Sequence, residues 1–449
     1  QTDAMGFNWT YEYDEQNRRV AEINPLGATT RCAYDENGNL IGVTDANGHT
    51  WTYQYDLLNR KVAEITPLGN VWSWGYDAVG NQISRTDANG ATTEYIYCCL
   101  DRVIRTNYPD GTYIKTGYNV CYCDPTKEIH YAPDSTVING FTKTIDALGR
   151  PVSVTTNYGA VNKSVSYTYD GVGNVLSVST PDGRVINYTY DGNSRVISIS
   201  DSSMGEVHYS YDAAGRITAR SFGDITTSFV YDDANRLLEV STSIAVIPPP
   251  PGPPTILATA SAPWAYAYQY DANGRRTAMY EETPYWNGTH NYTYDAAGRL
   301  LQVSYPWGET VMYTYDAVGN RLTEAVGKGV KNYVYDVENR LIASYFSPYS
   351  IHRWAWDYDS NGNQIAQTVI NGTSGPYYSY DYENRLTNVR LNPDNPGDTN
   401  VSYAYLPNGD RIKRANDTET THYLYDREDV IAILDSTGTP IQSFLHGIG

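Results

Sequence analysis

The hexapeptide YDAAGR at residues 211–216 is one copy of a short pattern that recurs along most of this 449-residue chain. Its tyrosine and aspartate return at a spacing near 21 residues, within the local sequence Y-D-x-x-G-R or Y-D-x-x-G-N. A fixed period of this length indicates a repeat architecture, in which each small unit packs on its neighbours. Function is therefore expected from the assembled surface. The repeat-motif residues are Tyr13, Asp14, Tyr34, Asp35, Tyr55, Asp56, Tyr76, Asp77, Tyr169, Asp170, Tyr190, Asp191, Tyr211, Asp212, Tyr315, Asp316, Tyr335 and Asp336.

The composition favours an all-β protein with an acidic surface. The chain has 44 tyrosines and 37 glycines but only 6 phenylalanines, a balance that suits pleated strands joined by tight turns. A formal net charge of −19 argues against binding to nucleic acid or to anionic lipid. No apolar run is long enough to span a membrane as a helix. Because the chain starts at Gln1 without a signal sequence, we expect a fragment or a processed product.

Each repeat is predicted to be a β-hairpin. Residues 14–17 form a polar turn, residues 19–23 alternate like a strand, residues 25–27 form a second turn, and residues 29–34 form the returning strand. Consecutive hairpins should give one antiparallel meander with a row of turns along each edge. The returning strands place rings on one face and small hydroxyls on the other, and we expect the phenol hydroxyls to bond outward while the rings pack.

The motif also resembles a known family. The copies at residues 211–216 and 315–320, together with the number of repeats, make the chain similar to the Rhs/YD-repeat family over nearly its whole length. That family includes bacterial Rhs proteins, the B and C shell components of insecticidal toxin complexes, wall-associated proteins and teneurins. The resemblance implies a long β-ribbon wound into a hollow YD-repeat shell or spiral barrel, often holding a variable C-terminal segment. Residues 422–426 and 444–447 look like the last repeats before the family's core-associated region, so cargo, plug and self-cleavage residues are expected to be absent.

We expect one continuous YD-repeat segment over residues 1–449, with two breaks in the pattern. Roughly twenty repeats would give about 40 strands, and so long a sheet must coil. Its area would enclose too little space for a typical toxin domain, so the chain is expected to be part of a larger cage or to fill its own interior. The breaks are an irregular cysteine-containing repeat at residues 98–140 and a proline-rich loop insertion at residues 244–262.

The cysteines of the first break allow three interpretations. Cys98, Cys99, Cys121 and Cys123 lie close enough in sequence for a possible disulfide, although free structural thiols and a metal site are alternatives. Cys32 stands apart and is expected to be a small strand residue. The proline-rich loop should be a stiff surface insertion, or alternatively a ligand for a partner's aromatic groove.

No catalytic, cofactor-binding or metal-binding residue is predicted. The segments starting at Asp45, Asp87 and Asp359 resemble the opening of calcium loops, but an EF-hand needs a glutamate at its twelfth position, and Ile370 occupies that position after Asp359. We therefore expect ordinary turns. Repetition singles out no carboxylate pair for glycoside hydrolysis.

The leading hypothesis is a non-enzymatic shell of a secreted or surface-displayed bacterial protein that encapsulates or presents a C-terminal toxin or effector. Its expected partners are its own cargo, other shell segments and copies of itself. The alternative is an adhesion or self-assembling protein that adds copies through open edge strands. A carbohydrate-acting enzyme or lectin is the third hypothesis; the tryptophans available for stacking on sugars are Trp264, Trp286, Trp307, Trp354 and Trp356.

Overall fold

The computed structural model describes residues 1–119, 124–159, 161–244, 264–283, 285–347, 353–370, 373–391 and 400–445. These ranges contain 39 β-strands, close to the predicted number, and the all-β prediction is confirmed. In the same ranges, no helix has the length and apolar character needed to cross a bilayer.

The strands fall into two compact units. Unit 1 comprises Gln1–Thr30 and Ile186–Asn332, and unit 2 comprises Arg31–Val185 and Tyr333–Ile448. The prediction of a single segment over residues 1–449 remains a prediction. Of the two predicted breaks, residues 120–123 and 245–263 lie outside the described residues.

The strands of unit 1 are β1 (Thr10–Tyr13), β2 (Arg19–Ile23), β18 (Val196–Asp201), β19 (Gly205–Tyr211), β20 (Ile217–Phe222), β21 (Ile225–Tyr231), β22 (Leu237–Ile244), β23 (Trp264–Tyr270), β24 (Arg276–Glu282), β25 (Asn287–Tyr294), β26 (Leu300–Ser304), β27 (Thr310–Tyr315) and β28 (Arg321–Val326). Three strands cross a boundary between the units, namely β3 (Thr29–Tyr34), β17 (Val185–Tyr190) and β29 (Gly329–Tyr335).

The early strands of unit 2 are β4 (Leu40–Thr44), β5 (Thr50–Tyr55), β6 (Lys61–Ile65), β7 (Val71–Tyr76), β8 (Gln82–Thr86), β9 (Thr92–Tyr97), β10 (Val103–Asn107), β11 (Tyr113–Tyr118), β12 (Pro125–Tyr131), β13 (Val137–Ile145), β14 (Pro151–Asn157), β15 (Asn162–Tyr169) and β16 (Val175–Ser179). Its late strands are β30 (Leu341–Ser347), β31 (Arg353–Tyr358), β32 (Gln364–Ile370), β33 (Thr373–Tyr380), β34 (Leu386–Arg390), β35 (Asn400–Tyr405), β36 (Arg411–Ala415), β37 (Thr420–Asp426), β38 (Asp429–Leu434) and β39 (Pro440–Ser443).

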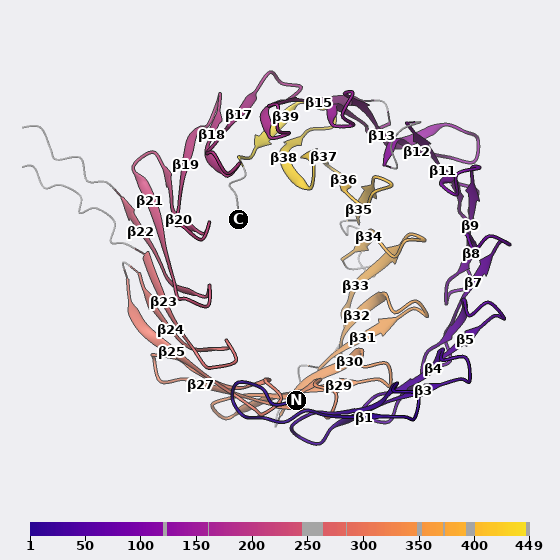
Figure 1. Ribbon diagram of the computed structural model, residues 1–449, viewed down its shortest axis with the longest axis vertical. Coiled ribbons are helices and arrows are strands. Elements are labelled where there is room, and N and C mark those ends of the chain that lie inside the picture. The colour runs from indigo at the N-terminus through magenta and orange to yellow at the C-terminus, as the bar shows by residue number, and fades with distance from the viewer. Residues whose placement is uncertain are drawn as a thin grey trace, which may run out of the picture. The chain divides into compact units, whose positions relative to one another are not determined.

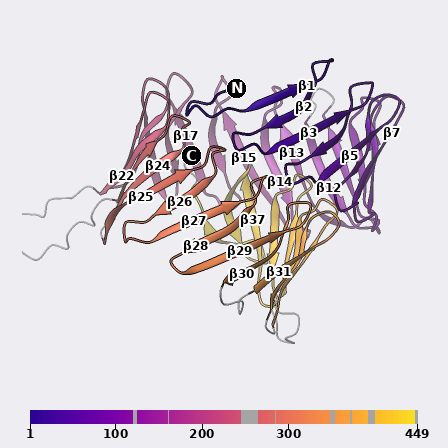
Figure 2. The same ribbon diagram turned by 90° about the horizontal axis from the view of Figure 1, so that it is seen from below.

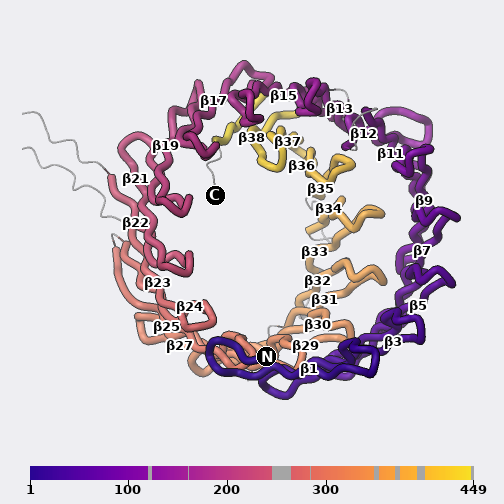
Figure 3. The backbone as a smooth tube through the Cα atoms, viewed as in Figure 1, coloured from indigo at the N-terminus to yellow at the C-terminus, as the bar shows by residue number. Residues whose placement is uncertain are grey.

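Strands that follow one another in sequence pair antiparallel, as the hairpin prediction required. β19 pairs with β20, and β20 pairs with β21. Figure 2 shows the same order from β24 to β28 in unit 1, and Figure 3 shows it from β5 through β7 to β9 in unit 2. The pairing shifts by one residue at the motif tyrosine, for example between Ser210 and Tyr211, which marks a β-bulge at that edge of the hairpin.

The predicted two-faced strands are also present. In β15, Val165 and Tyr167 are buried while Ser164, Ser166 and Thr168 are exposed. This alternation follows from the two-residue period of a strand, which sends successive side chains to opposite faces. The exposed hydroxyls bond across strands, as between Thr168 and Ser177 of the next strand.

The best-buried core of unit 2 lies where early and late strands meet. Val165 and Val178 on the early strands β15 and β16, and Leu424 and Leu434 on the late strands β37 and β38, are each at most 2% exposed. Figure 1 shows β37 and β38 beside β15. Among the motif tyrosines, Tyr13 is exposed and the others are half-buried.

Candidate functional site: the turn rows and the contacts between segments

The motif aspartate organises each turn of the first row. In residues 211–216, the backbone N–H of Asp212 donates to the Arg216 carbonyl at 3.0 Å, and the Gly215 N–H donates to the Asp212 carbonyl at 3.0 Å. The Asp212 Oδ1 accepts the Arg216 N–H at 2.9 Å. Because the backbone and guanidinium donors of Arg216 favour the carboxylate, they hold the pKa of Asp212 below its usual value.

The residue before the arginine adopts a left-handed conformation. Gly215 has a φ of 87°, and Asn235 takes the same position in the next turn with a φ of 62°. Glycine and asparagine tolerate this region, which explains why the motif has them there.

The motif arginine joins one repeat to the next. Arg216 Nε donates to Asp212 Oδ2 at 2.6 Å, and its Nη1 donates to the backbone carbonyl of Asp232, one repeat later, at 2.8 Å. Its guanidinium also lies 4.9 Å from the centre of the Tyr231 ring. The arginines that bond the carbonyl of the next motif aspartate in the same way are Arg60, Arg150, Arg195, Arg236, Arg275, Arg299 and Arg340.

The motif tyrosine joins its repeat to the preceding one. The Tyr211 hydroxyl donates to the Val196 carbonyl at 2.6 Å, and the Tyr315 hydroxyl donates to the Leu300 carbonyl at 2.7 Å. Burial raises the pKa of both phenols. These hydroxyls thus bond the backbone of the wall itself, which differs from the expected outward bonding. The accepting carbonyl lies at the start of the strand that follows a turn, and there the tyrosine of the next repeat can reach it.

We call the combination of tyrosine bond, aspartate turn and arginine bridge the repeat clamp. Among the predicted motif residues, the aspartates whose carboxylate meets a clamp arginine are Asp14, Asp56, Asp191, Asp212 and Asp336. Those bonded instead by an asparagine amide are Asp35, Asp77, Asp170 and Asp316. Tyr13 differs from the other motif tyrosines in being 56% exposed.

Cys98 occupies the aspartate position of one turn. Its N–H donates to the Arg102 carbonyl at 2.9 Å, as the motif aspartates do. Backbone N–H groups of Leu100 and Arg102, with the Arg102 guanidinium, lower the pKa of the Cys98 thiol. Cys98 is half-buried and Cys99 is exposed, whereas Cys121 and Cys123 lie outside the described residues. The disulfide therefore remains a prediction.

In unit 2, turns of the early strands contact turns of the late strands. The early turns lie at the hairpin edge opposite the motif aspartates, and we call them the second row; the late turns begin with a motif aspartate and belong to the first row. Asn89 Nδ2 donates to Asp359 Oδ2 at 3.1 Å, and Asn361 Nδ2 donates to Asp87 Oδ2 at 2.8 Å. The Asn89 N–H also donates to Asn361 Oδ1 at 3.1 Å. Two turns that resembled calcium loops in the sequence thus bond each other, reciprocally, across about 270 residues of chain.

Further contacts of the same kind follow along unit 2. Arg85 Nη2 donates to the Tyr382 carbonyl at 2.9 Å, and the Tyr108 ring stacks on Tyr382 with centroids 5.8 Å apart. The Tyr108 hydroxyl donates to Glu383 at 3.2 Å, and burial, with the nearby Glu383 charge, raises its pKa. Near the end of unit 2, Arg184 Nη2 donates to the Ile431 carbonyl at 2.9 Å.

Unit 1 contains an equivalent contact, between Asn273 and the first residues of the chain. Asn273 Nδ2 donates to Asp3 Oδ2 at 2.8 Å, and the Met5 N–H donates to Asn273 Oδ1 at 3.1 Å. None of these contacts was predicted from the sequence. For the contact between Asn89 and Asn361, the shared D-x-N-G turns were the available signal, since each turn presents an amide and a carboxylate that complement a second copy of itself.

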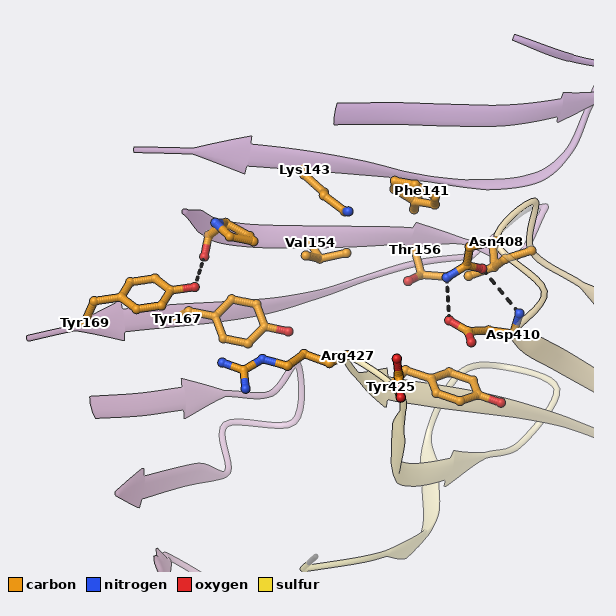
Figure 4. Close-up of a pocket in the computed structure, with 13 residues that line it drawn as sticks. Phe141, Lys143, Val154, Thr156, Tyr167, Tyr169, Asn408, Asp410, Tyr425 and Arg427 are labelled. Atoms are coloured by element: carbon orange, nitrogen blue, oxygen red, sulfur yellow. Dashed lines mark hydrogen bonds between the residues drawn. The ribbon is translucent and has the colours of Figure 1, made fainter. Parts of the chain in front are cut away.

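A pocket of about 320 Å³ lies in unit 2 between the face of β13 to β15 and two turns of the late strands. Figure 4 shows Phe141, Lys143 and Tyr167 on one side of it, and Asp410 and Arg427 on the other. The lining contains no histidine or cysteine. Throughout the described residues, no group of three histidine, cysteine, aspartate or glutamate side chains could hold a metal ion.

Comparisons with known proteins agree with this architecture. The RHS Repeat family profile matches residues 1–29, 34–71, 61–92 and 294–331, and the Teneurin YD-shell profile matches residues 162–246. Curated protein sequences gave no match.

Solved structures extend the likeness to nearly the whole chain. A Tc holotoxin pore from Photorhabdus luminescens has a TM-score of 0.59 and 16% identity, covering 96% of this chain and 27% of its own. The TcdB2-TccC3 structure has a TM-score of 0.57 and 16% identity, covering 97% of this chain and 28% of its own. This chain therefore spans less than a third of those chains and shares their fold.

Proposed function

Because this chain belongs to the Rhs/YD-repeat family, we propose that it is a wall segment of a non-enzymatic shell that encloses or presents a C-terminal toxin or effector. The observation that carries the proposal is the repeat clamp. Each clamp bonds the polar groups of its motif to the neighbouring repeats, as Arg216 and Tyr211 do, so the motif supports a continuous wall. A secreted or surface-displayed bacterial protein is the setting that suits such a shell.

The contacts between early and late segments of unit 2 support a barrier function. A row of turns joins the early strands to the late strands by hydrogen bonds, such as those between the turns of Asn89 and Asn361. Sheet segments that are joined in this way block the passage of proteases and other macromolecules to one side. A shell protects its contents by this steric exclusion. The chain covers 27% of the Tc holotoxin chain that it resembles, so further wall is expected to complete the enclosure.

Protease protection tests the proposal. The full-length protein is treated with a broad-specificity protease. Intact-mass spectrometry follows the cleavage of this chain and of the C-terminal segment that it is proposed to enclose. We expect the strands to survive and the first cuts to fall within residues 244–262, with the following segment protected. An Arg299→Ala variant, which loosens one clamp, should expose the following segment sooner. Early cleavage throughout the repeats, or a following segment cut equally fast in both proteins, would overturn the proposal.

A self-assembling surface protein is the second candidate. It is favoured by the terminal strands, because β1 pairs with β2 and β39 pairs with β38, and their other edges could add strands from further copies. Negative-stain electron microscopy separates the candidates. Discrete particles support the shell, whereas filaments that lengthen with protein concentration support assembly.

A further inference from the structure

The turn at residues 305–309 in unit 1 carries an exposed aromatic platform. The sequence is Tyr-Pro-Trp-Gly-Glu, and the Trp307 ring stacks on Tyr305 with centroids 4.6 Å apart and planes 18° apart. The Trp307 indole N–H donates to Glu309 Oε2 at 3.1 Å, which fixes the orientation of the ring. Trp307 nevertheless remains 60% exposed.

Buried groups hold this platform rigidly in place. His290 is 7% exposed and meets Trp307 edge-on, with centroids 5.9 Å apart and planes at 90°. The His290 Nε2 lies 3.3 Å from Glu281 Oε2. At Gly288, an added Cβ would lie 2.3 Å from Pro306 Cβ, so only glycine lets the turn pack this closely on β25. A preorganised aromatic surface loses little conformational entropy when it binds a ligand.

The clamps elsewhere in the chain show what such a surface accepts. Arg299 lies 5.0 Å from the centre of the Tyr315 ring while its Nε bonds Asp295 at 2.6 Å. A guanidinium is thus held by an aromatic face and a carboxylate together, and this trio recurs in repeat after repeat. Planar guanidinium suits the trio, because it stacks on a ring and still donates hydrogen bonds in its plane.

The platform has two members of the trio. Trp307 supplies the ring and Glu309 supplies the carboxylate, but within the described part of the chain no arginine or lysine lies over Trp307 or Tyr305, and none forms an ion pair with Glu309. Glu309 also occupies the fifth position of its turn, where the first-row clamps have arginine. The turn therefore presents a cation-accepting surface in a chain whose net charge is −19.

We propose that Trp307 and Glu309 form a docking site for a basic segment of a partner protein. An arginine of the partner lies on the indole face and pairs with the Glu309 carboxylate, completing the trio that the clamps build internally. Exposed tryptophan on a rigid support is typical of interface hot spots. This site adds a partner to the chain and is independent of the proposed shell function.

A matched pair of peptides tests the docking site. A fluorescein-labelled peptide with four arginines and the same peptide with citrulline are titrated into the full chain at physiological ionic strength. Citrulline keeps the planar shape and removes the charge. We expect the arginine peptide to bind and the citrulline peptide to bind at least about tenfold more weakly, because both cation–π and ion-pair terms are lost.

Variants then locate the binding on the chain. Trp307→Ala and Glu309→Gln should each weaken the arginine peptide by about tenfold. Glu36→Gln, which removes the same charge from an exposed turn residue, should leave the affinity unchanged. Thermal melting confirms that each variant is folded. If Trp307→Ala does not fold, Glu309→Gln still decides the test.

Three results would overturn the proposal. Equal weakening by Glu36→Gln and Glu309→Gln would mean that only the overall charge attracts the peptide. Equal affinity for citrulline would remove the role of the cation. Self-association of the chain that disappears in Trp307→Ala, seen by sedimentation velocity, would assign the site to a second copy instead of a basic partner.

Discussion

The described hairpins within residues 191–316 of unit 1 and within residues 35–102 of unit 2 are alike, but the turns that begin with a motif aspartate close differently. In the first region, the turns that begin with a motif aspartate all end in arginine, and the five arginines are Arg195, Arg216, Arg236, Arg275 and Arg299. In the second region, asparagine alternates with arginine, and the final turn has Cys98 in place of aspartate.

The difference shows how one turn position sets the coupling between repeats. Arg299 reaches the carbonyl of Asp316 in the next repeat at 2.7 Å, in addition to its own aspartate. The shorter Asn81 amide bonds Asp77 at 3.0 Å and reaches only a side-chain oxygen of the next turn, that of Asp101. An arginine side chain thus bonds the backbone of the next repeat through a charge-assisted donor, whereas an asparagine joins two side chains.

Acid should produce the largest effect, because it acts on every turn with a motif aspartate. The Arg216 N–H and guanidinium lower the pKa of Asp212, and the Asn39 amide lowers the pKa of Asp35. A lowered folded-state pKa stabilises the fold above the ordinary aspartate value of about 3.9, and this stability is lost as the pH falls through the lowered value. Both regions should therefore unfold below about pH 4, which circular dichroism at stepped pH can measure. A protein unchanged down to pH 2 would contradict the capping role of the aspartates.

Removing one arginine should affect its surroundings more than removing one asparagine. Arg299→Ala loses a carboxylate pair, a carbonyl bond and a ring contact, so we expect a cost of about 2–3 kcal/mol. Asn81→Ala should cost about 1 kcal/mol. Urea denaturation, with hydrogen exchange of the flanking strands, measures both. Equal effects of the two substitutions would remove the distinction between the regions.

The tyrosine bond should contribute less than the arginine bridge. Tyr315→Phe removes the hydroxyl that bonds the Leu300 carbonyl at 2.7 Å, and we expect a loss of about 1 kcal/mol. Tyr231→Phe is a matched control, because the Tyr231 ring also lies under a clamp arginine while its hydroxyl has no hydrogen bond to another described residue. If both substitutions cost the same, the ring and not the hydroxyl joins the repeats.

The smallest change in stability is expected at the cysteine turn. Since neighbouring N–H groups and Arg102 lower the pKa of Cys98, alkylation of this thiol under reducing conditions should be half-maximal below the ordinary thiol value of about 8.5. Arg102→Ala should move that midpoint upward, as measured by peptide mass spectrometry. Cys98→Asp restores the common motif and should raise the stability of the turn only slightly, as measured by urea denaturation. An unchanged midpoint in Arg102→Ala would contradict the guanidinium contact. Mapping without reductant tests the predicted disulfide.

The hairpins and turns could be predicted from the sequence because their causes are local. The alternation in residues 165–169 determines which side chains of β15 are buried, and the glycine of Y-D-x-x-G-R marks the left-handed turn position. The destinations of the polar groups could not be predicted. The phenol hydroxyl was expected to bond outward, yet Tyr211 bonds Val196, because the acceptor belongs to a strand of the preceding repeat.

The same limit applies to the aromatic residues. Five tryptophans were equivalent in the sequence, but Trp307 lies with Trp286, Tyr305 and His290, whereas Trp354 packs against Phe346. The signal for the cluster was the turn sequence at residues 305–309, whose glutamate replaces the usual small or polar closing residue.

By itself, the sequence determined that this protein is a series of antiparallel hairpins with one ring-bearing face and two rows of turns, since period and turn chemistry act within a few residues. Only the tertiary structure decided which turns meet, such as Asp87 with Asn361 across 274 residues. D-x-N-G turns occur at several places in the chain, so their chemistry alone does not choose a partner. The choice depends on the small rotations between neighbouring strands, which accumulate over many repeats and have no local sequence signal.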